Sequence, residues 1–260
     1  MPFADVDDQH IYFEDSGGPG PAVIFSHGFL MDHEMFEPQV EALRDEFRCI
    51  TWDERGFGQT PATAPFSYWD SAEDCLALLS HLDIERAVLA GMSQGGFVSM
   101  RAALLAPDRV KGLVLIDTQA GTEAEEARPL FYGMHDQWVR EGPGDELAAG
   151  VAAMIMSSGY DSTPWIAKWK AAPKEHMTLP FNCLMDREDL TERLAEIGAP
   201  AIIFHGEADA AIPMELAEAL GAGLANCVEL VRIPGAGHAA NLSHPDAVNG
   251  PLRAFLRRYA

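Results

Sequence analysis

The chain of 260 residues is long enough for one large α/β domain, or for a core with one insertion, and it can bury a substantial core. With 48% hydrophobic and 22% charged residues, it has the composition of a soluble globular protein. Its 40 acidic residues against 18 basic ones give a net charge of −22. This charge argues against nucleic acid and anionic membrane surfaces as partners, and it disfavours anionic substrates unless a local basic pocket binds them.

Neither the cysteines nor the amino terminus indicates export. Cys49, Cys75, Cys183 and Cys227 are widely separated and form no C-x-x-C pair, so we expect buried free thiols rather than a disulfide or metal framework. Residues 1–8 have no basic start and no long apolar region, and no apolar run is long enough to span a membrane. We therefore expect a cytoplasmic protein.

Strand-like and helical segments alternate in the first half of the chain. Predicted strands cover residues 3–6, 10–15, 22–26, 49–52, 87–90 and 110–116, and predicted helices cover residues 35–47, 68–82 and 97–106. Alternation of this kind predicts a mainly parallel sheet with helices on both faces.

The alternation stops at about Gly121, and no clear strand follows before Pro200. The region between contains predicted helices over residues 125–140, 146–156, 165–171 and 187–197. Strands at 200–204 and 228–233 and helices at 214–224 and 245–258 then resume the pattern. The sequence thus predicts an α/β core of residues 1–121 and 198–260, with residues 122–197 inserted as a helical cap.

The predicted cap is rich in tryptophan and methionine: Trp138, Trp165, Trp169, Met134, Met154, Met156, Met177 and Met185. A cap above the strand ends would form a lid, and Trp138, Met154 and Trp165 are our candidates for substrate contact. We expect more than half of the set to pack the cap helices together instead.

The most informative motif is Gly-Met-Ser-Gln-Gly-Gly at residues 91–96, between a predicted strand and a predicted helix. This is the context of the G-x-S-x-G nucleophile elbow, in which a strained turn exposes a serine at the carboxyl end of a strand. Side chains at Gly91 and Gly95 would collide with the neighbouring chain. Ser93 is therefore the candidate nucleophile.

A serine hydroxyl needs a base within hydrogen-bond reach. Of nine histidines, His238 has the most suggestive context, because it follows the last predicted strand in a glycine-containing loop. His27 and His205 also lie at strand ends, and we expect both to be structural.

The base in turn needs a carboxylate to hold its tautomer. Asp209 follows the penultimate predicted strand and gives the chain order serine, acid, histidine. Asp117, at the end of the preceding strand, and Glu207 remain alternatives. For the oxyanion, the backbone N–H of Gln94 and that of Phe29, in the loop after an early strand, are the candidate donors.

These motifs resemble those of the α/β-hydrolase superfamily, in its serine-nucleophile branch with a short helical cap. The matching segments are HGF at 27–29, DERGFG at 53–58, GMSQGG at 91–96, G-x-x-D-x-x-x-P at 206–213 and GAGH at 235–238. By this resemblance, Asp53 and Arg55 have a structural role. The length and the GH-x-x-N ending at 237–241 are most similar to esterases and 3-oxoadipate enol-lactonases.

The resemblance implies a serine hydrolase with an acyl-enzyme intermediate, without a metal or organic cofactor. We expect it to cleave a carboxylic ester or lactone of a small, largely apolar molecule, as a monomer or homodimer. An anionic lactone would need a cationic cap residue, for which the sequence offers Arg128, Arg140, Lys168, Lys170, Lys174, Arg187 and Arg193.

Serine at position 93 argues against haloalkane dehalogenase and epoxide hydrolase chemistry, because in this superfamily those activities use a carboxylate nucleophile. Carbon–carbon bond hydrolysis and cofactor-free perhydrolysis remain open, because they use the same triad. A small-molecule receptor that has kept the hydrolase pocket is a further alternative from a different functional class.

Overall fold

The computed structural model describes residues 2–6 and 9–260. Within them, eight strands form one sheet in the order β1-β2-β4-β3-β5-β6-β7-β8. β1 and β2 pair in antiparallel fashion, as do β2 and β4, and the other neighbouring strands are parallel. The strands are β1 (Phe3–Val6), β2 (Gln9–Asp15), β3 (Ala22–Ser26), β4 (Arg48–Trp52), β5 (Ala87–Met92), β6 (Val110–Ile116), β7 (Ala201–Gly206) and β8 (Cys227–Ile233).

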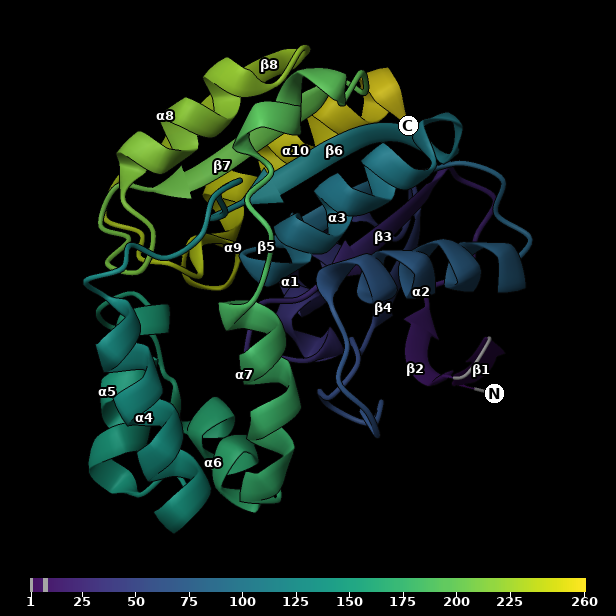
Figure 1. The fold of residues 1–260 in the computed structure, drawn as a ribbon. Helices are drawn as coiled ribbons and strands as arrows, with labels where there is room; N and C mark the ends of the chain where they lie inside the picture. Colours follow the sequence, from purple (N-terminus) through teal and green to yellow (C-terminus); the bar gives the residue numbers. More distant parts are fainter. Residues whose placement is uncertain (1, 7–8) are drawn as a thin grey trace.

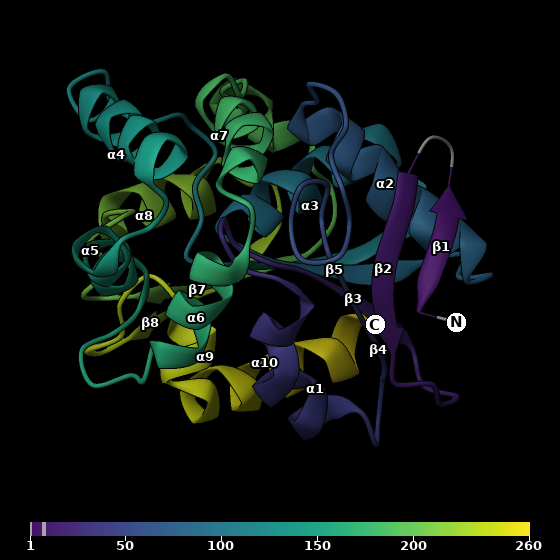
Figure 2. The same cartoon turned by 90° about the horizontal axis from the view of Figure 1, so that it is seen from below.

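Helices cover both faces of the sheet, as the alternation of elements predicts (Figure 2). They are α1 (Glu37–Leu43), α2 (Tyr68–His81), α3 (Gln94–Leu105), α8 (Met214–Gly223), α9 (Ala240–Ser243) and α10 (Pro245–Tyr259), with the short 3-10 helices η1 (His33–Phe36) and η2 (Pro107–Arg109). No helix of the described residues is both long and apolar enough to cross a bilayer.

Alternate residues of the central strands point to opposite faces and build two apolar clusters. Leu89 and Leu113 pack with residues of α2, α3 and α8. Their neighbours Val88 and Val114 pack with residues of α1 and α10 on the other face. All four side chains are fully buried, and each such burial stabilises the fold by about 1.5–3 kcal/mol. The strands of the sheet's centre are thereby fixed, and their carboxyl ends form a rigid platform.

The chain between β6 and β7 is helical and contains α4 (Arg128–Glu141), α5 (Asp145–Ile155), α6 (Thr163–Ala171), η3 (Lys174–Met177), α7 (Thr178–Met185) and η4 (Thr191–Glu196). Figure 1 shows α4 to α7 gathered together, apart from the helices that cover the sheet. We call this group the cap; its division from the core at residues 121 and 197 stays a prediction.

One expected helix, over residues 187–197, is wrong. The regular helix is α7, which ends at Met185, and only the 3-10 helix η4 lies in the expected range. Pro180 lies in the first turn of α7, where a missing N–H does no harm. The Asp189 side chain accepts a hydrogen bond from the Thr191 backbone N–H at 2.7 Å, which favours a tight turn there.

Candidate active site

Ser93 lies in a strained turn between β5 and α3, with φ 50° and ψ −112°. Side chains added at Gly91 and Gly95 would place a Cβ 2.0 Å from the carbonyl oxygens of Gly95 and Ser26 respectively, so the collision expected from the sequence is confirmed. The turn is held by hydrogen bonds from Ser93 N–H to the Ile116 carbonyl (2.8 Å) and from the Thr118 hydroxyl to the Ser93 carbonyl (2.7 Å). Such strain persists only where the surrounding structure enforces it.

Ser93, His238 and Asp209 come together from three separate segments of the chain. His238 Nε2 lies 3.0 Å from the Ser93 hydroxyl oxygen, and His238 Nδ1 lies 2.8 Å from Asp209 Oδ2. Because a carboxylate only accepts hydrogen bonds, the proton of the neutral imidazole belongs on Nδ1, which leaves Nε2 to accept from the serine. This is the arrangement that activates a serine nucleophile.

The other two candidate acids take different positions. Glu207 is exposed, and the Asp117 carboxylate binds two backbone N–H groups, those of Gly206 (2.8 Å) and Ala240 (2.9 Å). Asp209 is itself oriented by N–H groups of Ala211 and Ile212, at 2.8 and 2.9 Å from its Oδ1. The geometry therefore favours Asp209 as the acid that faces His238.

Burial and neighbouring charges shift the pKa values of His238, Asp209 and Asp117. Burial by itself lowers the pKa of His238, but the Asp209 charge and hydrogen bond outweigh it, so the pKa lies above the ordinary 6.5. Burial raises the pKa of Asp209, yet His238 and the Ile212 N–H bring it below its usual value. Burial, followed by repulsion from Asp209, raises the pKa of Asp117 to about 8. At neutral pH, Asp209 is thus the ionised member of the two.

His205, at the end of β7, supports the acid loop. Its Nε2 lies 2.8 Å from the Ile212 carbonyl and 3.6 Å from Asp209 Oδ2. Burial lowers the pKa of His205, so the ring is neutral at pH 7 and can donate to the carbonyl. The structural role expected for this histidine agrees with these contacts.

The two candidate oxyanion donors come from the start of α3 and from the loop after β3. Gln94 is the first residue of α3, so its backbone N–H has no partner within the helix, and the helix dipole adds positive character. Phe29 lines the same pocket as Ser93. A Cβ at Gly28 would come within 2.5 Å of Met92 Sδ, so a side chain at this position would require Met92 to move.

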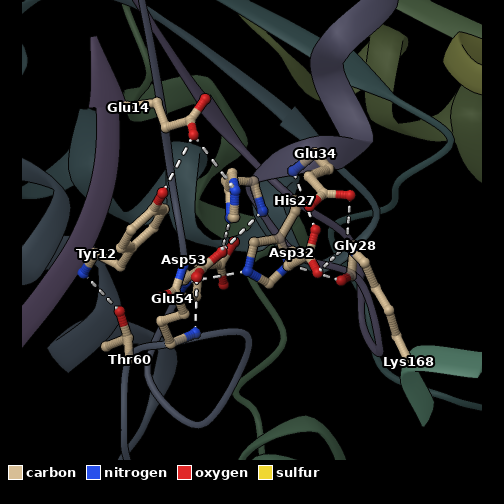
Figure 3. A network of polar contacts seen from close by, with 12 residues as sticks. Tyr12, Glu14, His27, Gly28, Asp32, Glu34, Asp53, Glu54, Thr60 and Lys168 are labelled. Carbon is tan, nitrogen blue, oxygen red and sulfur yellow. Dashed lines mark hydrogen bonds and ion pairs between the residues drawn. The ribbon is translucent and has the colours of Figure 1, made fainter. Parts of the chain in front are cut away.

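A polar network that sequence patterns did not reveal holds the loop 27–34, which carries Phe29 (Figure 3). His27 Nε2 accepts the Glu54 backbone N–H at 3.0 Å. Asp53 Oδ1 accepts from the His33 backbone N–H and ring, at 2.8 and 2.7 Å. Asp53 is therefore a structural residue of this loop. Arg55 has its own partner in Asp74 on α2, with Nη2 to Oδ1 at 2.9 Å.

Helix α6 of the cap binds the same loop. Lys168 Nζ lies 2.6 Å from Asp32 Oδ2 and 2.7 Å from Glu34 Oε2, and Figure 3 shows this lysine reaching the two carboxylates. The Trp169 indole N–H donates to the Leu30 carbonyl at 2.7 Å. Since Leu30 has a φ of 65°, an uncommon conformation, these contacts fix the backbone next to Phe29.

Ser93 and His238 open into a cavity of about 440 Å³ between the core and the cap. Most of its wall is apolar and comes from α4, α5, α7 and the loops that carry Phe29 and Ile212. Trp138 and Met154 line it, but Trp165 does not: its ring is buried in the cap and Lys168 Nζ lies 4.6 Å from the ring centroid. Four of the eight cap residues singled out in the sequence line the cavity: Met134, Trp138, Met154 and Met177.

Two groups of acidic and histidine side chains have spacing that could suit a metal ion, namely Asp32-His33-Asp53 and Asp117-His205-Asp209. Their carboxylates already accept hydrogen bonds from backbone N–H groups and histidine rings. These contacts account for both groups as parts of the loop scaffold and of the arrangement around His238.

Known proteins with similar sequences and structures point to one family. The model of the protein family described as alpha/beta hydrolase fold matches residues 21–245 of this chain. AB hydrolase superfamily protein YisY of Bacillus subtilis is 29% identical over 261 residues, covering 95% of this chain and 96% of YisY. An esterase from Thermogutta terrifontis, solved with malate bound, is 31% identical with a TM-score of 0.87, and 96% of this chain and 94% of the esterase are covered.

An enol-lactonase from Burkholderia xenovorans is 25% identical with a TM-score of 0.89, and 98% of this chain and 100% of the enol-lactonase are covered. The eight-stranded, mainly parallel sheet with helices on both faces is the fold of these relatives. The chain belongs to the alpha/beta hydrolase fold family.

Proposed function

We propose that this protein is a serine hydrolase that cleaves a carboxylic ester or lactone of a small, largely apolar molecule through an acyl-enzyme intermediate. The observation that carries the proposal is the hydrogen-bonded chain Ser93–His238–Asp209, which opens into an apolar cavity. The similarity to an esterase and to an enol-lactonase supports the same class of reaction.

In this mechanism His238 Nε2 takes the proton of Ser93 as the serine oxygen attacks the acyl carbon. Asp209 holds the imidazole in the required tautomer and stabilises the imidazolium ion that forms. The backbone N–H groups of Phe29 and Gln94 bind the negative oxygen of the tetrahedral intermediate. His238 then protonates the leaving alcohol, and a water molecule activated by the same histidine releases the acid.

In the proposed complex the cap and the acid loop bind the substrate. Trp138 and Met154 face the cavity from α4 and α5, and Ile212 faces it from the loop that carries Asp209. A cavity of about 440 Å³ has the size of a site for one small molecule. The methionines and the tryptophan offer adaptable apolar contact to an acyl chain or a ring.

The test is a series of p-nitrophenyl esters and small lactones, assayed with wild type and with Ser93→Ala. We expect Ser93→Ala to lower kcat/KM by more than about a thousandfold, because it removes the nucleophile. Ser80→Ala, the same change at an exposed serine of α2, should leave the rate unchanged. Far-ultraviolet circular dichroism checks that both variants fold.

Mass spectrometry after treatment with a phosphonate inhibitor identifies the nucleophile directly, and we expect the label on Ser93. A near-normal rate of Ser93→Ala would refute the acyl-enzyme mechanism. Product analysis separates the remaining chemistries. A peracid product would identify perhydrolysis as the reaction, and a cleaved carbon–carbon bond would identify carbon–carbon bond hydrolysis. Binding without turnover or labelling would instead identify a receptor.

A further inference from the structure

The cavity next to Ser93 has an unusual distribution of charge. Among the described residues that line it, no lysine or arginine is present. Its ionisable members are His238, which belongs to the proposed catalytic group, and two others, Glu123 and His135. A negatively charged substrate would therefore meet one carboxylate and no lysine or arginine in this cavity.

All seven cationic cap residues that the sequence offered as anion binders have other partners. Salt bridges or hydrogen bonds join Arg128 to the Met185 carbonyl, Arg140 to Glu141, Lys168 to Asp32 and Glu34, Lys170 to Asp145, Lys174 to the Arg140 carbonyl, Arg187 to Glu123, and Arg193 to Glu196. None of the seven lines the cavity.

Arg187 packs against the cavity wall, because three residues that it contacts, Glu123, Phe97 and Leu184, belong to that wall. Its side chain is only 1% exposed, and Nη1 binds Glu123 Oε2 at 2.5 Å and the Leu184 carbonyl at 2.8 Å. Nε and Nη2 bind the Gly121 carbonyl at 3.2 and 3.0 Å. The guanidinium is thus shared among protein acceptors, and its Glu123 partner stands at the cavity wall.

His135 is the remaining ionisable residue of the wall, which also contains the uncharged polar residues Gln119 and Thr122. Its ring stacks on Phe181, with centroids 4.2 Å apart and an interplanar angle of 16°. Nδ1 lies 3.3 Å from the Asp136 carboxylate, whereas Nε2 is buried and has no hydrogen-bond partner among the described residues. With the proton on Nδ1, facing the carboxylate, Nε2 is an acceptor, which suits a hydroxyl or amide N–H group of a ligand.

We propose that the site takes an uncharged ester or lactone and rejects one with a carboxylate at the far end of its acyl chain. His135 Nε2 accepts a hydrogen bond from an uncharged donor, such as a hydroxyl, in that position. The proposal rests on the proposed hydrolase function and narrows its substrate class. The narrower class follows from which charged side chains line the cavity.

Three p-nitrophenyl esters of equal chain length test the proposal: the hexanoate, the ω-hydroxyhexanoate and the monoester of adipic acid, which ends in a carboxylate. We expect kcat/KM for the hexanoate and the hydroxyhexanoate to exceed that for the adipate by about a hundredfold, since a buried charge without a partner is strongly disfavoured. An adipate ester turned over as efficiently as the hexanoate would overturn the proposal.

His135→Phe keeps a ring against Phe181 and removes Nε2. We expect it to raise KM for the hydroxyhexanoate about tenfold relative to KM for the hexanoate. His176→Phe, the same change at an exposed histidine outside this cavity, serves as the matched control. Equal effects on both esters would refute the hydrogen bond to His135, and an adipate activity that depends on His135 would show that the ring binds anions instead.

Glu123→Gln tests whether charge causes the rejection of a carboxylate. The glutamine keeps a hydrogen-bond acceptor for Arg187 but leaves the positive charge of Arg187 without a carboxylate partner. We expect adipate turnover to rise relative to hexanoate turnover, and an unchanged ratio would contradict rejection by charge. Failure of the proposed function is distinguishable: it would appear as no ester turnover and no labelling of Ser93. Labelled Ser93 with equal use of hexanoate and adipate would refute the substrate class alone.

Discussion

His238 lies between a serine hydroxyl and a buried carboxylate, and in the proposed mechanism these neighbours determine the pH at which it can act as a base. Only the neutral imidazole can accept the serine proton. Since Asp209 outweighs burial and holds the pKa of His238 above 6.5, kcat/KM should rise with pH through a midpoint above 6.5. Steady-state rates with a neutral ester between about pH 5 and 9 measure this midpoint.

Asp209→Asn removes the charge that raises the pKa of His238 and leaves the burial that lowers it. The midpoint should therefore move down from its wild-type position, and the rate should fall by about 10⁴ because the wrong tautomer is favoured. Glu207→Gln, two residues away and exposed, is the matched control and should change neither quantity. A midpoint that stays in place in Asp209→Asn would contradict the assignment of the acid.

Asp117 joins the two loops that bring Asp209 and His238 together, because its carboxylate accepts N–H groups of Gly206 and Ala240. Asp117→Ala leaves both donors buried without their acceptor, so the free energy of unfolding should fall by roughly 2–4 kcal/mol. Asp117→Asn retains one acceptor oxygen and should cost less. Urea denaturation measures both, with the exposed Asp108→Ala as control. Equal stabilities of wild type and Asp117→Ala would show that these hydrogen bonds do not hold the loops.

At the scale of elements, helix α6 and the loop 27–34 act as one unit. The contact from the Trp169 indole to the Leu30 carbonyl joins the cap helix to the residue next to Phe29. Trp169→Phe removes that donor but keeps an aromatic ring, and we expect kcat to fall up to about tenfold with little change in KM. The reason is that the Phe29 N–H would bind the transition state less well once its loop is less firmly held.

Trp69→Phe is a matched control for this change, because the Trp69 indole donates to Glu188 on a different surface of the molecule. It should leave kcat unaffected. An unchanged kcat in Trp169→Phe, measured with a substrate whose chemistry limits the rate, would show that α6 does not position the oxyanion donor.

Elements with a strong pattern were predictable from the sequence, and the weakly patterned ones were not. The strands at 22–26 and 110–116 were predicted with the bounds that the structure shows, since they are mainly apolar. Helix α3 begins at Gln94, three residues before the predicted start, because Gly95 and Gly96 resemble a loop although tertiary packing requires them in the first turn. Helix α7 was not predicted, because it has only eight residues, Pro180 among them, and so carries a weak helical pattern.

For the whole molecule, the linear order of motifs was enough to predict the α/β-hydrolase fold and to single out Ser93, Asp209 and His238. What the sequence could not show is where long polar side chains find partners. Lys168 meets Asp32 across 136 residues of chain, and Arg187 meets Glu123 across 64. Such pairings depend on the final positions of flexible side chains, and they decide which charges reach the cavity.

The net charge of −22 should act on charged substrates in solution as well as in the cavity. Screening shortens the range of this field from about 30 Å at 0.01 M salt to about 3 Å at 1 M. Raising sodium chloride from about 0.01 to 0.5 M should therefore increase kcat/KM for the p-nitrophenyl adipate several-fold. The hexanoate and the hydroxyhexanoate carry no charge on the acyl chain, so their values should stay within about a factor of two. An equal response of all three esters would indicate that salt acts on the protein itself. A flat response of the adipate would mean that its rejection arises inside the cavity alone, at Glu123, where salt does not reach.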